Sequence, residues 1–378
     1  MVLLTEEQES LLEVVADFAK ERIAPHALQW DAEKHFPVDI LAEAGELGLG
    51  GIYAAEDFGG GGLSRQDAVL IFEELAKADP ALAAYISIHN MVVWMIDSYG
   101  NDEQRELWVP ELASMQSLGS YCLTEPGAGS DAAALTTRAV LDGDEYVLNG
   151  VKQFISGAGS SAYYVVVCRT GGTGSKGIST LVVPADTPGL SFGPNEQKMG
   201  WNTQPTRQVA FEDVRVPVTH RLGEEGDGFQ IAMKGLNGGR VNIGACSLGG
   251  GQAALEKSVA YLKDRTAFGG PLTQQQSLVF ELADMDTELE SARTFLLRAA
   301  AALDGNASDT VKLCAMAKRV ATDVGFEIAN KALQLHGGYG YLHEYGIEKI
   351  VRDLRVHQIL EGSNEIMRLI VGRMLIDG

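Results

Sequence analysis

The chain has 378 residues, of which 46% are hydrophobic and 21% are charged, and its mean hydropathy is close to zero. These values are typical of a soluble globular protein with two or three domains. The formal charge of −21 at pH 7 argues against nucleic acid or an anionic membrane as a partner, because either would repel the chain.

No stretch of the sequence approaches the ~18 consecutive apolar residues of a membrane-spanning helix, so we expect no membrane insertion. The four cysteines are far apart and form no CxxC pair, which predicts neither a disulfide framework nor a metal site. They are expected to be small core residues in a reducing compartment: Cys122, Cys168, Cys246 and Cys314.

Residues 1–118 are expected to be helical. Thr5, followed by Glu-Glu-Gln, indicates a capped helix start, and neither a signal segment nor an Arg-rich leader precedes it. The sequence therefore predicts a cytoplasmic protein or the mature form of an organellar matrix protein. A second amphipathic helix is predicted over 66–78, with a cap at Ser64. Before it, the tetraglycine at 59–62 is interpreted as a flexible connector; close approach to a ligand is the alternative.

Residues 119–225 show short β patterns separated by turn signals. Asp142-Gly143-Asp144 predicts a hairpin, and Asn149-Gly150 predicts another turn. Two apolar runs, 163–168 and 178–183, are typical of buried strands. The zone is predicted to be a β-barrel or β-sandwich of roughly 100 residues.

After Gly226 the chain returns to long helical patterns, at 256–265, 278–303 and 311–335, with lengths typical of a four-helix bundle. The order α, then β, then α, without βαβ alternation, argues against a doubly wound nucleotide-binding fold. We predict an α+β multidomain protein with domains at 1–118, 119–225 and 226–378.

One acidic residue, Glu361, lies where two apolar helical patterns meet near the C-terminus. Gly362 suits the left-handed end of the first helix, and Ser363 can cap the second. Apolar neighbours on a rigid corner would raise the pKa of Glu361 and suit it to proton abstraction. The alternative is an ordinary exposed loop glutamate.

Two segments of the β zone could line a ligand. Residues 121–131 combine glycines, hydroxyls and free backbone N–H groups that could border a heteroaromatic ring or an anion; a plain Gly-Pro turn is the alternative. Phe154 and Ser156 place an aromatic ring beside a hydroxyl, which suits either flavin stacking or core packing. Neither a Walker loop nor GxGxxG is present.

Three residues of the C-terminal zone draw attention. Arg240 follows Gly238-Gly239, and Arg265 lies near Phe268, so either cation could bind phosphate or form a surface ion pair. His336 ends a helix in a glycine-rich turn without metal-ligand spacing, and is expected to be packed or bonded to the backbone. The absence of a GxSxG elbow argues against Ser-His-Asp hydrolysis.

Taken together, these segments resemble the acyl-CoA dehydrogenase family, flavoproteins that oxidise acyl-CoA thioesters. The resemblance covers nearly the whole chain, through ordered matches at 55–60, 121–131, 148–156, 265–269, 334–340 and 359–365. Within the family, three segments are similar to the branch that acts on isobutyryl-CoA in valine breakdown: 200–207, 235–243 and 357–365.

The resemblance implies an N-terminal helical domain, a middle β domain and a C-terminal four-helix bundle, with FAD between the last two. It also implies a homotetramer built as a dimer of dimers, which passes electrons to electron-transfer flavoprotein. Glu361 would take the α-proton of the thioester while the flavin accepts the β-hydride. The backbone N–H of Glu361 and a flavin hydroxyl would polarise the carbonyl.

The resemblance also implies site residues. The flavin would be bordered on one side by Tyr121, Leu123, Thr124, Gly129 and Ser130, and on the other by Phe154, Ile155 and Ser156. The neighbouring subunit's FAD would be reached by Arg265, Phe268, Gln276, Gln334, Leu335, Gly337 and Gly338, while Ser363 and Glu365 border the adenosine part. The acyl-CoA would face Ser130, Asn237, Arg240 and Gly362. Ala267 stands where the family often has Thr, which removes one hydroxyl contact.

The sequence does not determine the acyl chain of the substrate, because one methylene in an apolar pocket changes the binding free energy by only about 1–3 kcal/mol. Butyryl-CoA and 2-methylbutyryl-CoA are alternative substrates, and an acyl-CoA oxidase is an alternative activity. A non-catalytic scaffold that keeps this fold is the alternative from another class.

Overall fold

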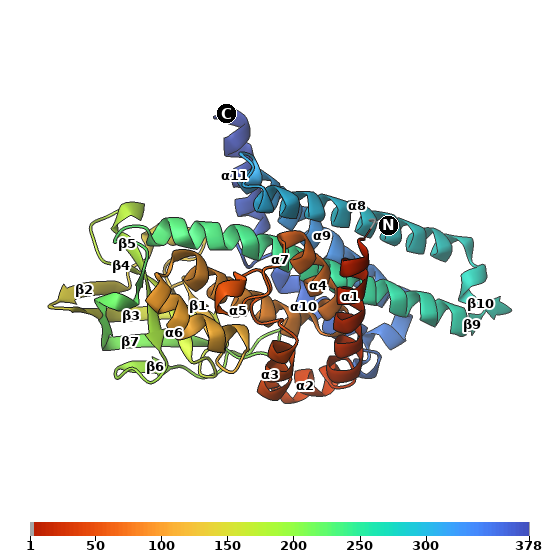
Figure 1. Cartoon of the computed structure of the whole chain (residues 1–378). Helices are drawn as coiled ribbons and strands as arrows, with labels where there is room; N and C mark the ends of the chain where they lie inside the picture. Colours follow the sequence, from red (N-terminus) through yellow and green to blue (C-terminus); the bar gives the residue numbers. More distant parts are fainter. Residues whose placement is uncertain (1–3, 378) are drawn as a thin grey trace.

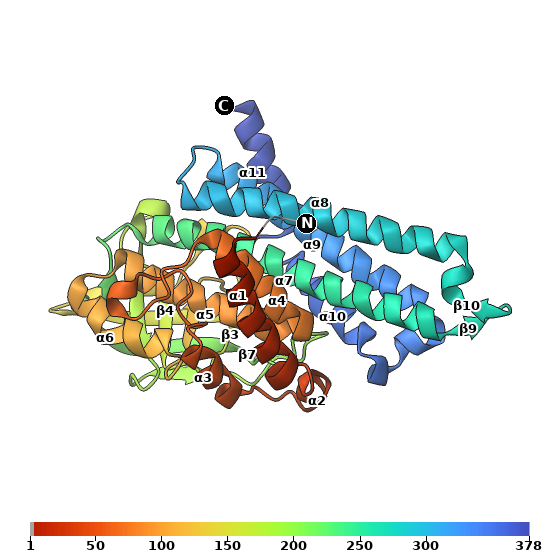
Figure 2. The ribbon, with the colours of Figure 1, turned by 45° about the vertical axis from the view of Figure 1, so that its right-hand side comes forward.

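The computed structural model describes residues 4–377, and Figure 1 shows its three parts. Helices from the N-terminal third lie between a β sheet at one end and long C-terminal helices that extend to the other. The predicted fold class, with helices, then a β region, then helices, is confirmed. Figures 1 and 2 both show the last helix projecting from the body beside the long helices.

The N-terminal part consists of α1 (Glu6–Phe18), α2 (Ala27–Glu33), α3 (Val38–Glu46), α4 (Arg65–Ala78), α5 (Pro80–Tyr99) and α6 (Asp102–Ala113). Both predicted helix starts are confirmed. Thr5 and Ser64 each accept a hydrogen bond from the backbone three residues on, and the side chain at that position bonds back to the cap. Each helix therefore begins at the residue where its sequence signal lies.

Contrary to the prediction, the tetraglycine connector at 59–62 is held by hydrogen bonds and is not a flexible loop. The N–H of Gly61 donates to the carbonyl of Gly51 (2.7 Å), and that of Gly62 to the carbonyl of Ala54 (2.9 Å). A side chain on Gly60 would overlap the backbone of Ala54. The glycines therefore let this segment fold back tightly onto 51–55 instead of moving freely.

The middle part forms one sheet of β1 (Gly119–Cys122), β2 (Arg138–Asp142), β3 (Glu145–Ser156), β4 (Tyr163–Arg169), β5 (Ile178–Pro184), β6 (Leu190–Phe192), β7 (Thr206–Pro217) and β8 (Arg221–Leu222). Its order is β6-β7-β3-β2-β4-β5-β8, with β1 paired to β4. β2 meets β4 at a single residue pair, Arg138 with Arg169. Two halves joined at this point enclose an apolar core between them.

The predicted turn at Asn149-Gly150 is wrong, because β3 runs straight through both residues. Gly150 takes φ 147° at a bulge against β7, where a Cβ would lie 2.7 Å from the Cα of Thr137. The Asn149 side chain bonds across to Asp213, which is left-handed. The glycine therefore provides close approach within a strand instead of a chain reversal.

β4 is buried on both faces, with the core of the sheet on one side and helices on the other. Tyr164, Val166 and Cys168 point into the core of the sheet. Val165 packs with residues of α5 and α6, and Val167 packs with residues of the first C-terminal helix. The continuous apolar run read from the sequence is what a strand covered on both sides requires.

The C-terminal part comprises α7 (Gly228–Asp264), α8 (Gln276–Asp304), α9 (Thr310–Leu335), α10 (Ile347–His357) and α11 (Asn364–Ile376). A small hairpin of β9 (Thr266–Ala267) and β10 (Gly270–Pro271) joins α7 to α8. The prediction placed the start of the first long helix at 256, which is wrong, because α7 begins at Gly228. Its first two-thirds are glycine-rich, and glycine lowers helix propensity.

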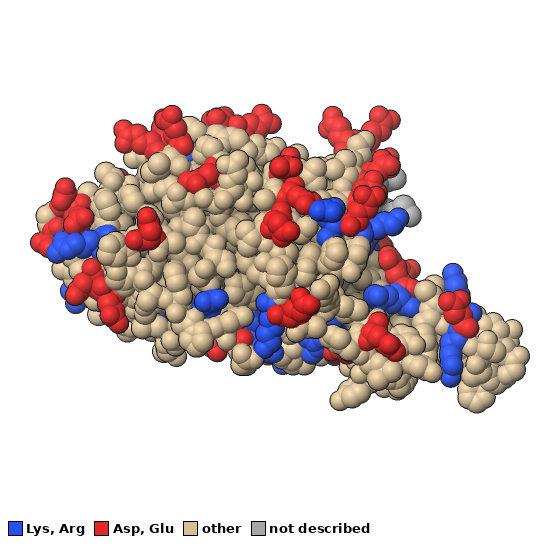
Figure 3. Space-filling model, turned by 90° about the horizontal axis from the view of Figure 1, so that it is seen from below, with Lys and Arg blue, Asp and Glu red and all other residues tan. Residues whose placement is uncertain are grey.

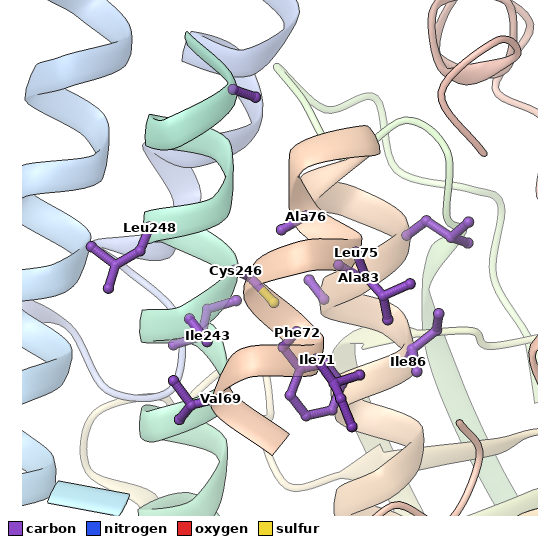
Figure 4. Close-up of a cluster of buried hydrophobic side chains, with 14 of the residues drawn as sticks. Val69, Ile71, Phe72, Leu75, Ala76, Ala83, Ile86, Ile243, Cys246 and Leu248 are labelled. Carbon is purple, nitrogen blue, oxygen red and sulfur yellow. The ribbon is translucent and has the colours of Figure 1, made fainter. Parts of the chain in front are cut away.

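Close packing explains why α7 is helical despite its glycines. Figure 4 shows apolar side chains of α4 and α7, among them Phe72 and Cys246, meeting between the two helices. A side chain at Gly249 would overlap the carbonyl oxygen of Glu73 in α4. Tertiary contact therefore overrides local propensity here.

All four cysteines are free and buried, as predicted. Within residues 4–377, no helix combines the length and apolarity needed to cross a bilayer, and no cluster of three His, Cys, Asp or Glu side chains could hold a metal ion. Figure 3 shows one face of the molecule, with acidic side chains around its edges and a largely uncharged centre.

The packing predicts a stability difference between two Gly→Ala variants. Gly249→Ala should destabilise the protein by about 1–3 kcal/mol, because the backbone of Glu73 cannot move aside cheaply. Gly372→Ala, in α11, meets nothing within 4 Å and should be neutral or slightly stabilising. Thermal unfolding followed by circular dichroism compares them; equal Tm values would contradict the argument.

Candidate active site

Glu361 lies on the turn of residues 358–363, between α10 and α11 (the 358–363 turn). Both Glu361 (φ 56°) and Gly362 (φ 87°) are left-handed, and a side chain on Gly362 would lie 2.6 Å from Cε of Met367. The Ser363 hydroxyl accepts a hydrogen bond from the N–H of Ile366, so the predicted cap of α11 is confirmed. The preceding helix already ends at His357, which makes the corner longer than expected.

The carboxylate of Glu361 rests against α7. A Cβ on Gly239 would lie 2.5 Å from Oε2, so only glycine leaves room for the carboxylate there. Oε2 is buried and receives no hydrogen bond from residues 4–377. Burial raises the pKa of Glu361 to about 7, although Arg240 and Lys318 oppose the shift. Glu361 is therefore a carboxyl group with a raised pKa at a buried position, and not an exposed loop glutamate.

Two buried cations flank this base. The Arg240 guanidinium donates to Oδ1 of Asn237 (2.8 Å) and to the carbonyl oxygen of Glu361 (3.3 Å). The Lys318 ammonium donates to the carbonyl oxygen of Gly362 (2.9 Å). Neither cation forms an ion pair with a carboxylate in the described part of the chain. The site thus gathers local positive charge in an acidic protein.

Three of the four residues predicted to face the substrate are brought together here: Asn237, Arg240 and Gly362. The fourth, Ser130, is exposed on the loop after β1, and no hydrogen bond connects it to these three.

The two predicted flavin-bordering segments lie side by side. The N–H of Gln153 donates to the carbonyl of Thr124 (2.8 Å), and Oγ of Ser120 donates to the carbonyl of Ser156 (2.6 Å). Lys152 donates to the carbonyl of Leu123 (2.8 Å) and pairs with buried Glu125 (2.9 Å). The end of β1 is thereby pinned against the end of β3.

Several groups of these two segments fit a flat heteroaromatic cofactor. Phe154 is left-handed and 64% exposed, although it is a large aromatic residue. The Tyr121 hydroxyl is buried without a partner; burial and then the charge of Glu361 raise the pKa of Tyr121. Gly129 is exposed on the loop. Ile155 belongs to the sheet core, so only its backbone could face a ligand.

A second group of predicted residues lies at the far end of α7, around a hollow of about 470 Å³. The residues around it include Arg265, Gln334, Leu335, Gly337 and Gly338. Phe268, 91% exposed, and Gln276 lie on the adjoining hairpin and the start of α8. His336 forms a hydrogen bond with the carbonyl oxygen of Ala332, and its ring stacks on that of Tyr261. These are the contacts expected of a packed histidine.

The two groups are far apart in one chain. Arg240 and Asp264 belong to the same uninterrupted helix, and at 1.5 Å per residue they are separated by about 36 Å. Figures 1 and 2 show α7 running from beside the sheet to the distant β9–β10 hairpin. Ser363 and Glu365 lie at the start of α11, close to Glu361 and therefore to the Arg240 end of α7.

Sequence reasoning missed several residues that the structure places at the site. The sequence pattern indicates Gly239 only as a neighbour of Arg240, and it does not single out Lys318. Arg65 lies 3.4 Å over the ring of Tyr53, beside Gly238. Lys318 gave one usable signal, since it occupies an apolar position of the α9 pattern, four residues after Cys314.

Three domain models of the acyl-CoA dehydrogenase family match the chain: N-terminal at 5–116, middle at 120–214 and C-terminal at 226–376. The chain is 54% identical to mitochondrial isobutyryl-CoA dehydrogenase of Bos taurus, over 99% of this chain and 90% of that protein.

Two solved structures are similar over the full length of both chains. One is butyryl-CoA dehydrogenase from Megasphaera elsdenii, with 37% identity and a TM-score of 0.96. The other is a chain from a structure described as the electron transferring flavoprotein of Acidaminococcus fermentans, with 37% identity and a TM-score of 0.97.

The geometry predicts that Glu361 titrates near neutral pH. Infrared difference spectra should show a protonated-carboxyl band that grows as the pH falls through about 7, where ordinary carboxylates stay ionised. Glu361→Gln, which keeps the size of the side chain, should lack this band. A band that appears only near pH 4 in the wild type would contradict the burial argument.

Proposed function

This chain belongs to the acyl-CoA dehydrogenase family, and from this premise we propose that it oxidises isobutyryl-CoA to methacrylyl-CoA in valine breakdown. The resemblance drawn from the sequence is confirmed, and the protein is an oxidoreductase. The observation that carries the proposal is the buried carboxylate of Glu361, held beside Arg240 in a chain that closely resembles an isobutyryl-CoA dehydrogenase.

Proton removal is the step that the chain's own residues can perform. A proton next to a thioester is a weak acid, so its removal requires a polarised carbonyl group. Within residues 4–377 the backbone N–H of Glu361 donates to no acceptor, which leaves it free for the thioester oxygen. The Glu361 side chain then takes the α-proton of the substrate.

The surroundings of Glu361 make it an effective base. A carboxylate that has lost its water accepts a proton more readily, and a pKa of about 7 keeps an ionised fraction at neutral pH. Gly239 gives the carboxylate its place against α7, and Arg240 holds the carbonyl of the same residue. The base is thus oriented from both its backbone and its side chain.

FAD fits this site as the cofactor that would react with the acyl-CoA. We assign its binding to two segments, one of Tyr121, Leu123, Thr124, Gly129 and Ser130 and the other of Phe154, Ile155 and Ser156. When bound, FAD supplies the two-electron acceptor for the hydride that leaves the β-carbon. Ser363 and Glu365, at the start of α11, border its adenosine part.

The distant hollow requires a second subunit in this proposal. One cofactor cannot contact both Arg240's end of α7 and the hollow around Arg265 in a single chain, because about 36 Å of helix separates them. The hollow would therefore hold the FAD of a neighbouring copy, within a homotetramer built as a dimer of dimers. Ala267 offers no hydroxyl to that cofactor.

Electron-transfer flavoprotein is the proposed acceptor of the electrons. We take this acceptor from the resemblance to the family, and the description of a structure that contains a similar chain names an electron transferring flavoprotein of Acidaminococcus fermentans. Hydrogen peroxide release in air tests the alternative, an acyl-CoA oxidase. Its absence, with turnover restored by electron-transfer flavoprotein, is the expected result.

Anaerobic bleaching of the flavin by a panel of acyl-CoAs tests the proposed reaction. Isobutyryl-CoA should reduce the flavin fastest, ahead of butyryl- and 2-methylbutyryl-CoA. Glu361→Gln should bind FAD but bleach about 10²–10⁴-fold more slowly, because the proton acceptor is gone. Faster reduction by butyryl-CoA would overturn the branched assignment, and bleaching by no acyl-CoA would favour the scaffold alternative.

The two-subunit cofactor site predicts complementation between inactive variants. Glu361→Gln lacks the base, and Arg265→Ala lacks a contact to the neighbour's FAD. Co-expressed chains should regain activity, since one site in each mixed dimer combines an intact Glu361 with the partner's intact Arg265. Co-expression of differently tagged Glu361→Gln chains is the control. No recovery in purified mixed oligomers would show that Arg265 serves its own chain.

A further inference from the structure

Lys318 is a fully buried lysine with no carboxylate partner. Its side chain is 0% exposed on α9, and it forms no ion pair within residues 4–377. The ammonium donates to the carbonyl oxygen of Gly362 and to Oδ1 of Asn364, both at 2.9 Å. An unpaired buried charge is costly, and a lysine normally avoids it by reaching water. A lysine buried in this way indicates a specific role at the turn that it contacts.

Around Lys318, α9 holds both ends of the 358–363 turn. Nδ2 of Asn364 donates to Oδ1 of Asp323 (2.7 Å), and Nε2 of Gln358 donates to the same oxygen (2.8 Å). Asn364 also exchanges hydrogen bonds with Thr322. Of these contacts from α9, that of Lys318 lies nearest to Glu361 along the chain, because it is made to the carbonyl oxygen of Gly362.

The turn needs such contacts because its conformation is unfavourable. Glu361 is left-handed at φ 56°, and a residue with a side chain loses about 1–3 kcal/mol in such a conformation. Strain of this kind persists only where surrounding contacts fix it. The hydrogen bond to the carbonyl oxygen of Gly362 fixes the Gly362–Ser363 peptide, while Arg240 bonds the carbonyl oxygen of Glu361 in the peptide before it.

We propose that Lys318 is the positioning residue of the catalytic base: its ammonium locks the Gly362–Ser363 peptide of the turn that carries Glu361, and it sets the electrostatic environment of the carboxylate. The inference rests on the proposed role of Glu361 as the base. In this proposal Lys318 acts through the 358–363 turn, by its hydrogen bonds to Gly362 and Asn364.

The electrostatic part follows from the charges around the two groups. Burial lowers the pKa of Lys318 to about 7, against the opposing pull of Glu361. In turn, the positive charges of Lys318 and Arg240 hold the pKa of Glu361 below the value that burial alone would give. The remaining titratable groups near the pair are Tyr53, Tyr121, Asp323, His357 and Glu365.

Removing the charge should therefore raise the pKa of Glu361. The ionised base would then form only at higher pH, so the acidic limb of the rate profile should move upward. Lys318→Gln keeps a hydrogen-bond donor and removes the charge, whereas Lys318→Met removes both. The pair separates the electrostatic effect from the geometric one.

The rate test uses the flavin-loaded holoenzyme and whichever acyl-CoA bleaches the wild type fastest. Both variants should shift the acidic limb to higher pH. Lys318→Met should in addition lose about 10–100-fold in the limiting rate of flavin reduction, with little change in the substrate concentration for half-saturation, because the base is misplaced. Lys312→Met, six residues earlier on α9, is the matched control and should behave like the wild type.

The infrared band of Glu361 provides a measurement that needs no substrate. In Lys318→Gln the protonated-carboxyl band should persist to higher pH than in the wild type. An unchanged band and an unchanged acidic limb would overturn the proposal. If no acyl-CoA bleaches the wild type, the proposed reaction fails, yet the band still decides whether Lys318 governs Glu361. If Lys318→Met does not fold, Lys318→Gln carries the test.

Discussion

Close helix packing through glycine is the constraint on which the rest of this structure depends. α7 meets a different neighbour at almost every glycine along its length. A side chain at Gly239 would strike Glu361, one at Gly249 would strike the backbone of α4, and one at Gly251 would lie 3.2 Å from the backbone of α9. The helix can therefore serve as a shared wall for the N-terminal helices, the bundle and the candidate active site. Bulkier residues would hold these parts too far apart to enclose a base.

The proton affinity of Glu361 results from two opposed effects of that enclosure. Removal from water favours the neutral acid, whereas Arg240 and Lys318 favour the carboxylate. Because neither cation forms an ion pair with it, the carboxylate is not neutralised and keeps its basicity. A base of this kind needs cations that are close but do not contact it. In this chain both cations instead bond backbone carbonyls of the turn that carries it.

The sequence allowed much of the fold to be predicted where signals are local. The caps at Thr5 and Ser64, the β run of β4 and the corner at Glu361 depend on neighbouring residues, so a short window contains the information. The prediction failed where distant packing decides. The start of α7 is hidden by glycines that only tertiary contacts explain, and Gly150 forms a bulge because Thr137 lies against it. No short window indicates the role of Lys318, because its partners, Gly362 and Asn364, follow more than forty residues later.

The two halves of the proposed cofactor site are held at a fixed spacing by α7 and α9 together. Near the base, α7 contributes Gly239 and Arg240, while α9 contributes Lys318. At the far end, Tyr261 of α7 stacks on His336 after α9, with ring centroids 4.4 Å apart. The helices thus run in the same direction, and they touch midway at Gly251 and Gly325. A shift of either helix would disturb the base of one site and the hollow proposed for the neighbouring copy's cofactor. Rigid packing along this pair of helices therefore fixes the spacing between Glu361 and the hollow at the far end.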